Sequence, residues 1–246
     1  MRSILLRRAS NIGLLEQPIP VDSCFRRNDK KSKHNILLEA MISFLLLAVT
    51  ASVSLAAVGC DLNDPDRDVK RLFPGSTGFK TEYVSIDKKG GDSLLHQVEQ
   101  RLGDKFQGLF ETKDVPYTMY RIFRGKLLLG YIHGVNQKGT YGGLQVFLAV
   151  DTSGVIRSLY FQKLTSKAAK KLRDPKFGRQ FNGLSLVDFY DYDLATGKTA
   201  GKVGKIANPA PEAEADFRSA LRAAKKNLIL IDEFLLGNRH LKYFIK

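Results

Sequence analysis

Alternating apolar and polar residues between positions 117 and 163 predict a run of β-strands. The first of these segments carries Tyr117, Met119 and Phe123 on one side, as a period of two residues requires. Residues 144–150 are apolar at nearly every position, which is typical of a strand covered on both faces. Gly130 interrupts the second strand and predicts a bulge. The predicted strands are 117–123, 126–135, 144–150 and 155–163.

Apolar positions spaced three and four residues apart predict helices on either side of these strands. In residues 93–102 the leucines and the valine share one face. Residues 212–236 form the longest such pattern, with Pro211 before it, acidic residues in its first turns and lysines later, as the helix dipole favours. Residues 166–172 predict a short basic helix that ends before Pro175.

Together these elements predict a single domain of the α+β class. We expect a twisted, mostly antiparallel sheet from about residue 117 to residue 163. The helices 93–102 and 212–236 are expected to pack on it, within a domain that spans residues 72–246.

The segment before this domain has the composition of a targeting signal. Residues 42–59 contain no charged side chain and end in small residues before Cys60. The sequence AVGC at 57–60 resembles a bacterial lipobox, in which the cysteine is lipidated and becomes the new N-terminus. An uncleaved membrane anchor is the alternative, because about 18 apolar residues lie near the lower limit for a spanning helix. Both interpretations exclude residues 1–60 from the fold and place the domain in the bacterial cell envelope, membrane-anchored and facing the periplasm or the exterior.

A short acidic segment follows the predicted leader, although the chain as a whole is basic. Residues 61–68 hold four aspartates, and we interpret residues 61–71 as an acidic tether between membrane and domain. The whole chain has 39 Lys and Arg against 25 Asp and Glu, a net charge of +14. Residues 1–60 contribute eight basic and four acidic residues, so residues 61–246 keep a net charge of +10. An anionic partner is therefore expected, either lipid headgroups, an acidic protein or a ligand phosphate, and no nucleic acid.

Common catalytic and metal-binding patterns are missing from the sequence. The triplet GKT at 197–199 resembles the end of a phosphate-binding P-loop, but the glycine required five residues earlier is Tyr192. The histidines of the predicted domain, His96, His133 and His240, are not paired at the spacing of metal ligands. No G-x-S-x-G motif occurs. The sequence favours a binding or electron-transfer module over a stand-alone enzyme.

Five stretches follow one another in an order and at spacings typical of a known family. They read LFPG at 72–75, GY at 130–131, GTYGGLQV at 139–146, VDTSGVI at 150–156 and FGRQFNG at 177–183. In these stretches the chain resembles the FMN-binding domain. That family includes the C subunit of the sodium-pumping NADH:quinone reductase and the G subunit of the Rnf complex. The resemblance extends over residues 72–236, roughly two thirds of the chain.

The resemblance implies a membrane-tethered electron-transfer module, in which bound FMN carries the redox chemistry. A glycine-rich turn before a buried strand supports part of this, because it lets the backbone approach a planar ligand or a phosphate closely. The basic residues expected to help hold the phosphate are Lys167, Lys170, Lys171 and Arg173. The cofactor-binding residues that the resemblance implies are Tyr141, Gly142, Gly143, Thr165, Phe177, Gln180, Phe181 and Gly183.

Two segments depart from the family pattern. Members with covalent flavin attach it to the threonine of S-G-A-T, but residues 206–212 read IANPAPE and contain neither Thr nor Gly. The family segment E-T-P-G-L-G is replaced at 164–172 by LTSKAAKKL, in which Thr165 is the one match. We therefore expect FMN without a covalent bond, with a redox protein as partner. The alternative is a flavin-free binding or assembly protein of the same fold at the membrane.

Overall fold

The computed structural model of the protein describes residues 60–108 and 111–244. Every described residue belongs to one compact unit, Leu55–Lys246. The predicted signal or anchor at residues 42–59 lies outside the described residues. Within the described part of the chain, no helix is both long enough and apolar enough to span a bilayer.

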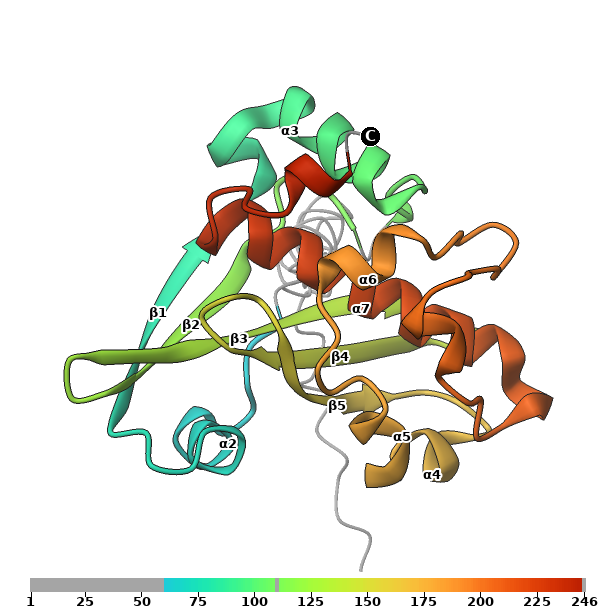
Figure 1. Ribbon diagram of the computed structural model, residues 1–246, viewed down its shortest axis with the longest axis horizontal. Coiled ribbons are helices and arrows are strands. Elements are labelled where there is room, and N and C mark those ends of the chain that lie inside the picture. The colour runs from blue at the N-terminus through green and yellow to red at the C-terminus, as the bar shows by residue number, and fades with distance from the viewer. Residues whose placement is uncertain (1–59, 109–110, 245–246) are drawn as a thin grey trace, which may run out of the picture. The chain divides into compact units, whose positions relative to one another are not determined.

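Five antiparallel strands form one sheet in the order β1-β2-β3-β4-β5, so each strand pairs with its neighbours in sequence (Figure 1). This architecture confirms the predicted α+β class with a mostly antiparallel sheet. The strands are β1 (Gly78–Val84), β2 (Tyr117–Arg124), β3 (Leu127–Lys138), β4 (Gly143–Val150) and β5 (Ile156–Leu164).

Strand β4 separates two apolar cores, as its continuous apolar run predicted. Leu144, Val146 and Leu148 belong to the larger core on one face of the sheet. Phe147 and Ala149 belong to a smaller core on the other face. The predicted bulge is also confirmed, because the register of β2 and β3 shifts between Ile122 and Phe123, opposite Gly130. The four predicted strands correspond to β2, β3, β4 and β5, with no end shifted by more than three residues.

Strand β1 is missing from the sequence-based prediction. Its sequence GFKTEYV pairs along its whole length with β2, from Gly78 opposite Phe123 to Val84 opposite Tyr117. Only Val84 in this strand is buried, because the strand lies at an edge of the sheet. A strand with such an exposed surface leaves little apolar alternation to detect.

Helices α7 (Glu214–Leu235) and α3 (Ile86–Leu102) lie above the sheet in Figure 1. Helix α7 packs on β3 and β4 and carries α3 against its outer side. Its bounds agree with the predicted helix 212–236 to within two residues. Helix α3 starts seven residues earlier than predicted, because Ser85 caps it and a kink at Gly91 joins two helical pieces. The apolar period covers only the second piece.

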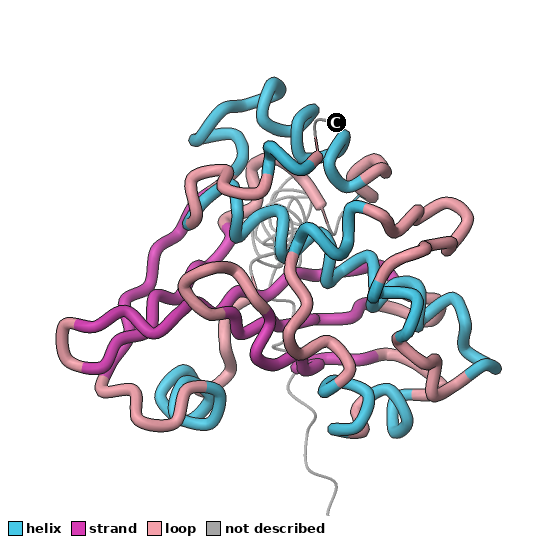
Figure 2. The backbone as a smooth tube through the Cα atoms, in the orientation of Figure 1, coloured by secondary structure: helices cyan, strands magenta, loops and turns pink. Residues whose placement is uncertain are grey.

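The predicted acidic tether is instead a structured part of the domain. Asp64 caps helix α2 (Pro65–Leu72) by accepting a hydrogen bond from the backbone N–H of Arg67 at 3.1 Å. Pro65 occupies the first turn, acidic residues follow it and basic residues end the helix, all of which favour helix formation. Val69 and Leu72 are buried against the smaller core. The helix thus covers the face of the sheet opposite α7 (Figure 2).

Short helices connect β5 to α7 and continue the chain after α7. The predicted basic helix 166–172 is shorter in the structure, where α4 spans Ala169–Leu172 and ends before Pro175. The remaining elements are α5 (Pro175–Arg179), α6 (Leu186–Tyr190), and the 3-10 helices η2 (Lys202–Lys205), η3 (Pro211–Ala213) and η4 (Leu241–Tyr243). Helices α4 and α5 lie beside β5 (Figure 1).

His133 in β3 lies in an environment that disfavours the charged form of its ring. Its side chain is fully buried, and Nδ1 lies 3.0 Å from the carbonyl oxygen of Thr118, to which it donates. Burial lowers the pKa of His133 from 6.5 to about 4. The neutral ring is therefore the form that the folded domain stabilises.

We expect His133 to make the domain sensitive to acid. Between pH 6.5 and pH 4 the unfolded chain binds a proton that the folded chain does not, so stability is full above this window and falls toward pH 4. The expected loss is about 3 kcal/mol, since one pKa unit corresponds to about 1.4 kcal/mol. Urea unfolding across this pH range should show a smaller loss in His133→Gln. The exposed His96 supplies the control His96→Gln, and the same pH dependence in all three proteins would contradict the prediction.

Candidate functional site

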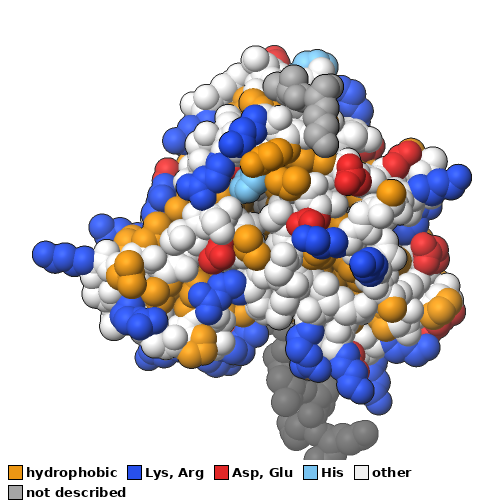
Figure 3. Space-filling view, in the orientation of Figure 1, with side chains coloured by type: hydrophobic (Ala, Val, Ile, Leu, Met, Phe, Trp, Pro, Cys, Tyr) orange, Lys and Arg blue, Asp and Glu red, His pale blue; other side chains and the backbone are white. Residues whose placement is uncertain are grey.

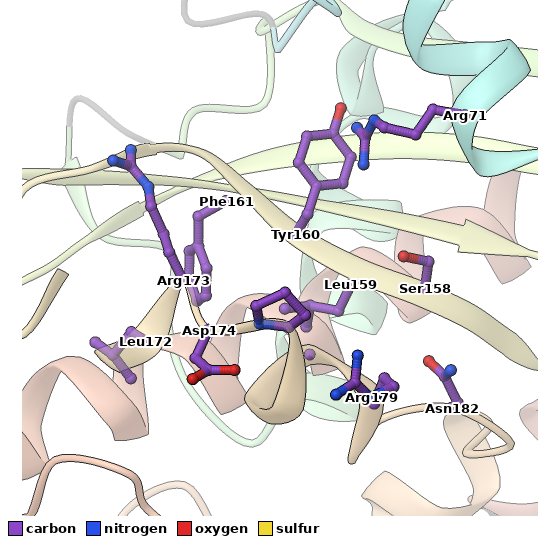
Figure 4. A pocket seen from close by; sticks show the side chains of 12 residues that line it. Arg71, Ser158, Leu159, Tyr160, Phe161, Leu172, Arg173, Asp174, Arg179 and Asn182 are labelled. Carbon is purple, nitrogen blue, oxygen red and sulfur yellow. The ribbon is translucent and has the colours of Figure 1, made fainter. Parts of the chain in front are cut away.

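A cavity of 410 Å³ lies where α2, β5 and the α4–α5 segment meet (Figure 4). Its volume is within the range of small-molecule sites, about 300–1,000 Å³. Three arginines line it, and they come from different parts of the chain. Arg71 belongs to the last turn of α2, Arg173 lies between α4 and α5, and Arg179 ends α5. We call this cavity the arginine pocket.

Two of the three guanidinium groups carry charge that the protein does not neutralise. Arg173 and Arg179 are exposed, and their guanidinium groups form no ion pair or hydrogen bond with any described residue. Arg71 differs, because it pairs with Asp68 at 3.2 Å and its guanidinium carbon lies 4.4 Å from the centroid of the Tyr160 ring. The pocket therefore offers two free cations and a third that is held in place.

The remaining lining residues supply neutral donors and one carboxylate. In Figure 4 the side chains of Arg179 and Asn182 point toward strand β5, which carries Ser158 and Tyr160. Burial, followed by the nearby Asp68, raises the pKa of Tyr160, so its hydroxyl remains protonated. The carboxylate belongs to Asp174, which uses Oδ1 to accept the backbone N–H of Lys176 at 2.8 Å and so caps α5.

The floor of the arginine pocket depends on a close approach between α5 and β5. A Cβ atom at Gly178 would lie only 2.6 Å from the carbonyl oxygen of Leu159, so a side chain there would push the helix away from the strand. Asp174 and Pro175 begin α5, as a cap and a first-turn proline. Arg179 and Asn182 follow at its end, which fixes their position relative to β5.

Four of the expected cofactor-binding residues come together at the start of β4. The backbone N–H of Thr165 lies 3.3 Å from the carbonyl oxygen of Gly143, and a Cβ at Gly142 would be 3.0 Å from Thr165 Cγ2. Tyr141 is 53% exposed, and Lys167 Nζ lies 4.8 Å from the centroid of its ring. The structure thus brings the glycine loop and Thr165 side by side, at an open surface.

The other four expected residues have structural roles. Phe177 and Phe181 are buried, with ring centroids 5.3 Å apart, and pack inside the larger core. The protein encloses both rings, and their expected contact with the cofactor stays a prediction. Gln180 binds the backbone of Ala207 from both ends of its amide, at 2.8 and 3.2 Å. Gly183 has φ +83° and turns the chain toward β5, where its N–H donates to Ile156 at 2.8 Å.

The four basic residues that were expected to bind phosphate lie at different places on the surface and do not form one cluster. Arg173 lines the arginine pocket. Lys171 instead pairs with Glu212 at 2.7 Å, and Lys167 lies over the Tyr141 ring. Lys170 is exposed on α4. One of the four is thus placed to meet a ligand in the pocket.

Arg71, Arg179 and Asn182 were missed by the sequence analysis. Arg71 belongs to the segment interpreted as a tether, and the other two occupy the variable positions of the FGRQFNG stretch. Their only signal in the sequence is positive charge or polarity, which most surface positions share. These three residues line one cavity because α2 and α5 pack on opposite sides of β5.

Cys60, the expected lipidation residue, is 2% exposed and belongs to the smaller core beside Leu62. Burial raises the pKa of its thiol to about 12. The sulfur in this position has no space around it for a diacylglyceryl group. Lipidation at Cys60 therefore requires that residues 60–62 leave the smaller core.

No protein-family model matches the chain, and a search of curated proteins finds no match.

Proposed function

We propose that this domain binds a phosphorylated small molecule without a covalent bond, in the arginine pocket. The observation that carries the proposal is the pair of unneutralised guanidinium groups, Arg173 and Arg179, on one cavity of 410 Å³. Arginine suits this role because its planar fork of N–H donors matches the oxygens of a phosphate. Asn182 and Ser158 add neutral donors to the lining of the same cavity.

FMN is the phosphorylated ligand that we propose. Support comes from the resemblance to FMN-binding domains and from the antiparallel α+β architecture. The family's covalent attachment motif is absent, so the phosphate must be held by charge and hydrogen bonds. With flavin bound, the domain acts as an electron-transfer module at the membrane of the cell envelope, and the flavin supplies the redox chemistry.

The second candidate function is a flavin-free binding or assembly protein of the same fold. It is favoured by the burial of Phe177 and Phe181, which leaves the FGRQFNG stretch as a packing element. In that case the arginine pocket would still bind a phosphate group, but without selectivity for the flavin ring. The two functions are separated by the ligand series below.

The proposal is tested by titrating the full-length chain with FMN or riboflavin while following flavin fluorescence, and with inorganic phosphate while following the heat of binding by calorimetry. We expect FMN to bind at micromolar concentration and to be displaced by phosphate, and riboflavin to bind at least tenfold more weakly. Arg173→Ala/Arg179→Ala should weaken FMN binding roughly 10- to 100-fold, because charge-assisted hydrogen bonds contribute about 1.5–3 kcal/mol each and these are partly screened by solvent.

A matched control removes two exposed cations that do not line the pocket, Arg124 and Lys205, each replaced by Ala. This variant has the same net charge as the arginine variant and should bind FMN normally. Equal weakening in both variants would reduce the effect to overall charge and contradict a specific pocket. Phosphate binding without FMN binding would support the second candidate function, and no binding of either would overturn both.

A further inference from the structure

The tip of the β2–β3 hairpin, residues 123–127, combines an exposed aliphatic side chain with unpaired cations. Leu127 is 62% exposed, one of the most exposed large apolar side chains among the described residues. Arg124 and Lys126 flank the turn, and Lys80 of the neighbouring strand lies 5.8 Å from the centroid of the Phe123 ring. None of these three cations forms an ion pair with a described residue.

Basic residues outnumber acidic ones in the segments that build this end of the molecule. Residues 69–81 and 115–150 contain no Asp or Glu and hold six Lys and Arg besides Lys138, of which Arg71 and Arg121 pair with the nearby Asp68 and Glu82. Figure 3 shows orange apolar side chains between blue basic ones at the end of the molecule where the hairpin lies. A groove of 440 Å³ beside the tip is lined by Phe79, Phe123 and Lys126, among others. The surface is thus basic and apolar at the same place.

We propose that the hairpin tip docks on an anionic lipid surface, with Leu127 entering the headgroup region and Lys80, Arg124 and Lys126 binding lipid phosphates. An apolar side chain ringed by cations matches the boundary between anionic headgroups and acyl chains. An acidic protein would complement the charges but would leave the aliphatic apex without an apolar partner. The inference is independent of the arginine pocket, which none of these four residues lines.

The chain contains no tryptophan, so Leu127→Trp places a single reporter at the apex of the hairpin. The full-length variant is mixed with vesicles of phosphatidylcholine, alone or with phosphatidylglycerol, and its emission is recorded. We expect a blue shift and protection from aqueous quenchers with the anionic vesicles only. High salt should reverse both effects, because screening removes the electrostatic attraction. Tyr243→Trp is the matched control, since Tyr243 is 43% exposed and lies in η4, and its emission should not change.

Removing the three basic side chains of the hairpin tip tests whether they bind lipid phosphates. We combine Lys80→Ala/Arg124→Ala/Lys126→Ala with Leu127→Trp. The lipid concentration that gives half of the emission shift should rise roughly 100-fold, since each basic residue near an anionic surface raises the membrane affinity about fivefold. Lys163→Ala/Lys198→Ala/Lys205→Ala removes three exposed cations elsewhere and should leave the shift intact.

An unchanged emission of Leu127→Trp on vesicles that bind the protein would overturn the proposal, because the chain would then be held by another segment. Equal shifts at positions 127 and 243 would also overturn it. A shift with polyglutamate but not with anionic vesicles would assign the tip to an acidic protein instead.

Discussion

Replacing Glu111 by glutamine should lower the free energy of unfolding by about 3–5 kcal/mol, the range measured when one partner of a buried ion pair is removed. Glu111 is 3% exposed and faces two buried cations on α7. Its carboxylate accepts two hydrogen bonds from Arg222, at 2.7 and 3.0 Å, and pairs with Lys226 as well. Glutamine would leave both cations inside the domain without their shared carboxylate.

The charges around Glu111 explain why the effect is large. Burial alone would raise the pKa of Glu111, but the Lys226 and Arg222 cations hold it below its ordinary value. Burial also lowers the pKa of Lys226, although Glu111 opposes that effect. Arg222 keeps contacts with Asp104 and Gln137, at 2.7 and 2.6 Å, whereas the hydrogen bond left to Lys226 among the described residues is the one to the carbonyl oxygen of Asn136. The unpaired ammonium of Lys226 is therefore the main cost of the substitution.

Urea unfolding of the parent, the single variant and a double variant measures this cost. Glu111→Gln/Lys226→Met should recover part of the lost stability, because the stranded ammonium is gone. Glu212→Gln is the control, since Glu212 forms an exposed pair with Lys171 and should change stability by less than about 1 kcal/mol. A loss in Glu111→Gln as small as that of the control would mean that the buried cations find other partners.

The sequence predicted the elements that bury many side chains. Strand β4 stands out by its continuous apolar run, and helix α7 by its helical period of buried residues. Strand β1 and helix α2 carry too few buried residues for a period to show. The signals for α2 were local, an aspartate and a proline at 64–65 followed by basic residues at 70–71, and the overall acidity of the segment concealed them.

The arginine pocket was less predictable than the fold, because tertiary contacts assemble it. Arg71 and Arg179 are more than a hundred positions apart in sequence and meet only because α2 and α5 both pack beside β5. The FGRQFNG stretch predicted the location of the pocket but not the residues that line it. The FGRQFNG stretch does form one wall of the pocket, but through its variable residues Arg179 and Asn182 and not through its aromatic ones.

Replacing Gly130 by alanine should lower the free energy of unfolding by about 3–5 kcal/mol, as the sum of backbone strain and overpacking. Gly130 has φ +153°, which side chains rarely adopt. A Cβ at this position would lie 2.1 Å from the carbonyl oxygen of Val150 and 3.0 Å from the ring of Phe73. Both neighbours are fixed, because Val150 pairs with Tyr131 in the sheet and Phe73 is buried at the end of α2.

A second glycine separates the two causes of this loss. Gly125 has φ +57° in the hairpin turn, and a Cβ there would meet no atom within 4 Å, so Gly125→Ala should cost only about 1 kcal/mol through the backbone. The additional loss of unfolding free energy in Gly130→Ala, relative to Gly125→Ala, measures how closely β3, β4 and Phe73 pack at this position. Thermal or urea unfolding of both variants reports it, and equal losses would contradict the close packing of Phe73 on Gly130. Phe73 also lies beneath Arg157, whose guanidinium carbon is 5.0 Å from the ring centroid. The missing Cβ of Gly130 therefore decides how α2, and with it Arg71, docks beside the arginine pocket.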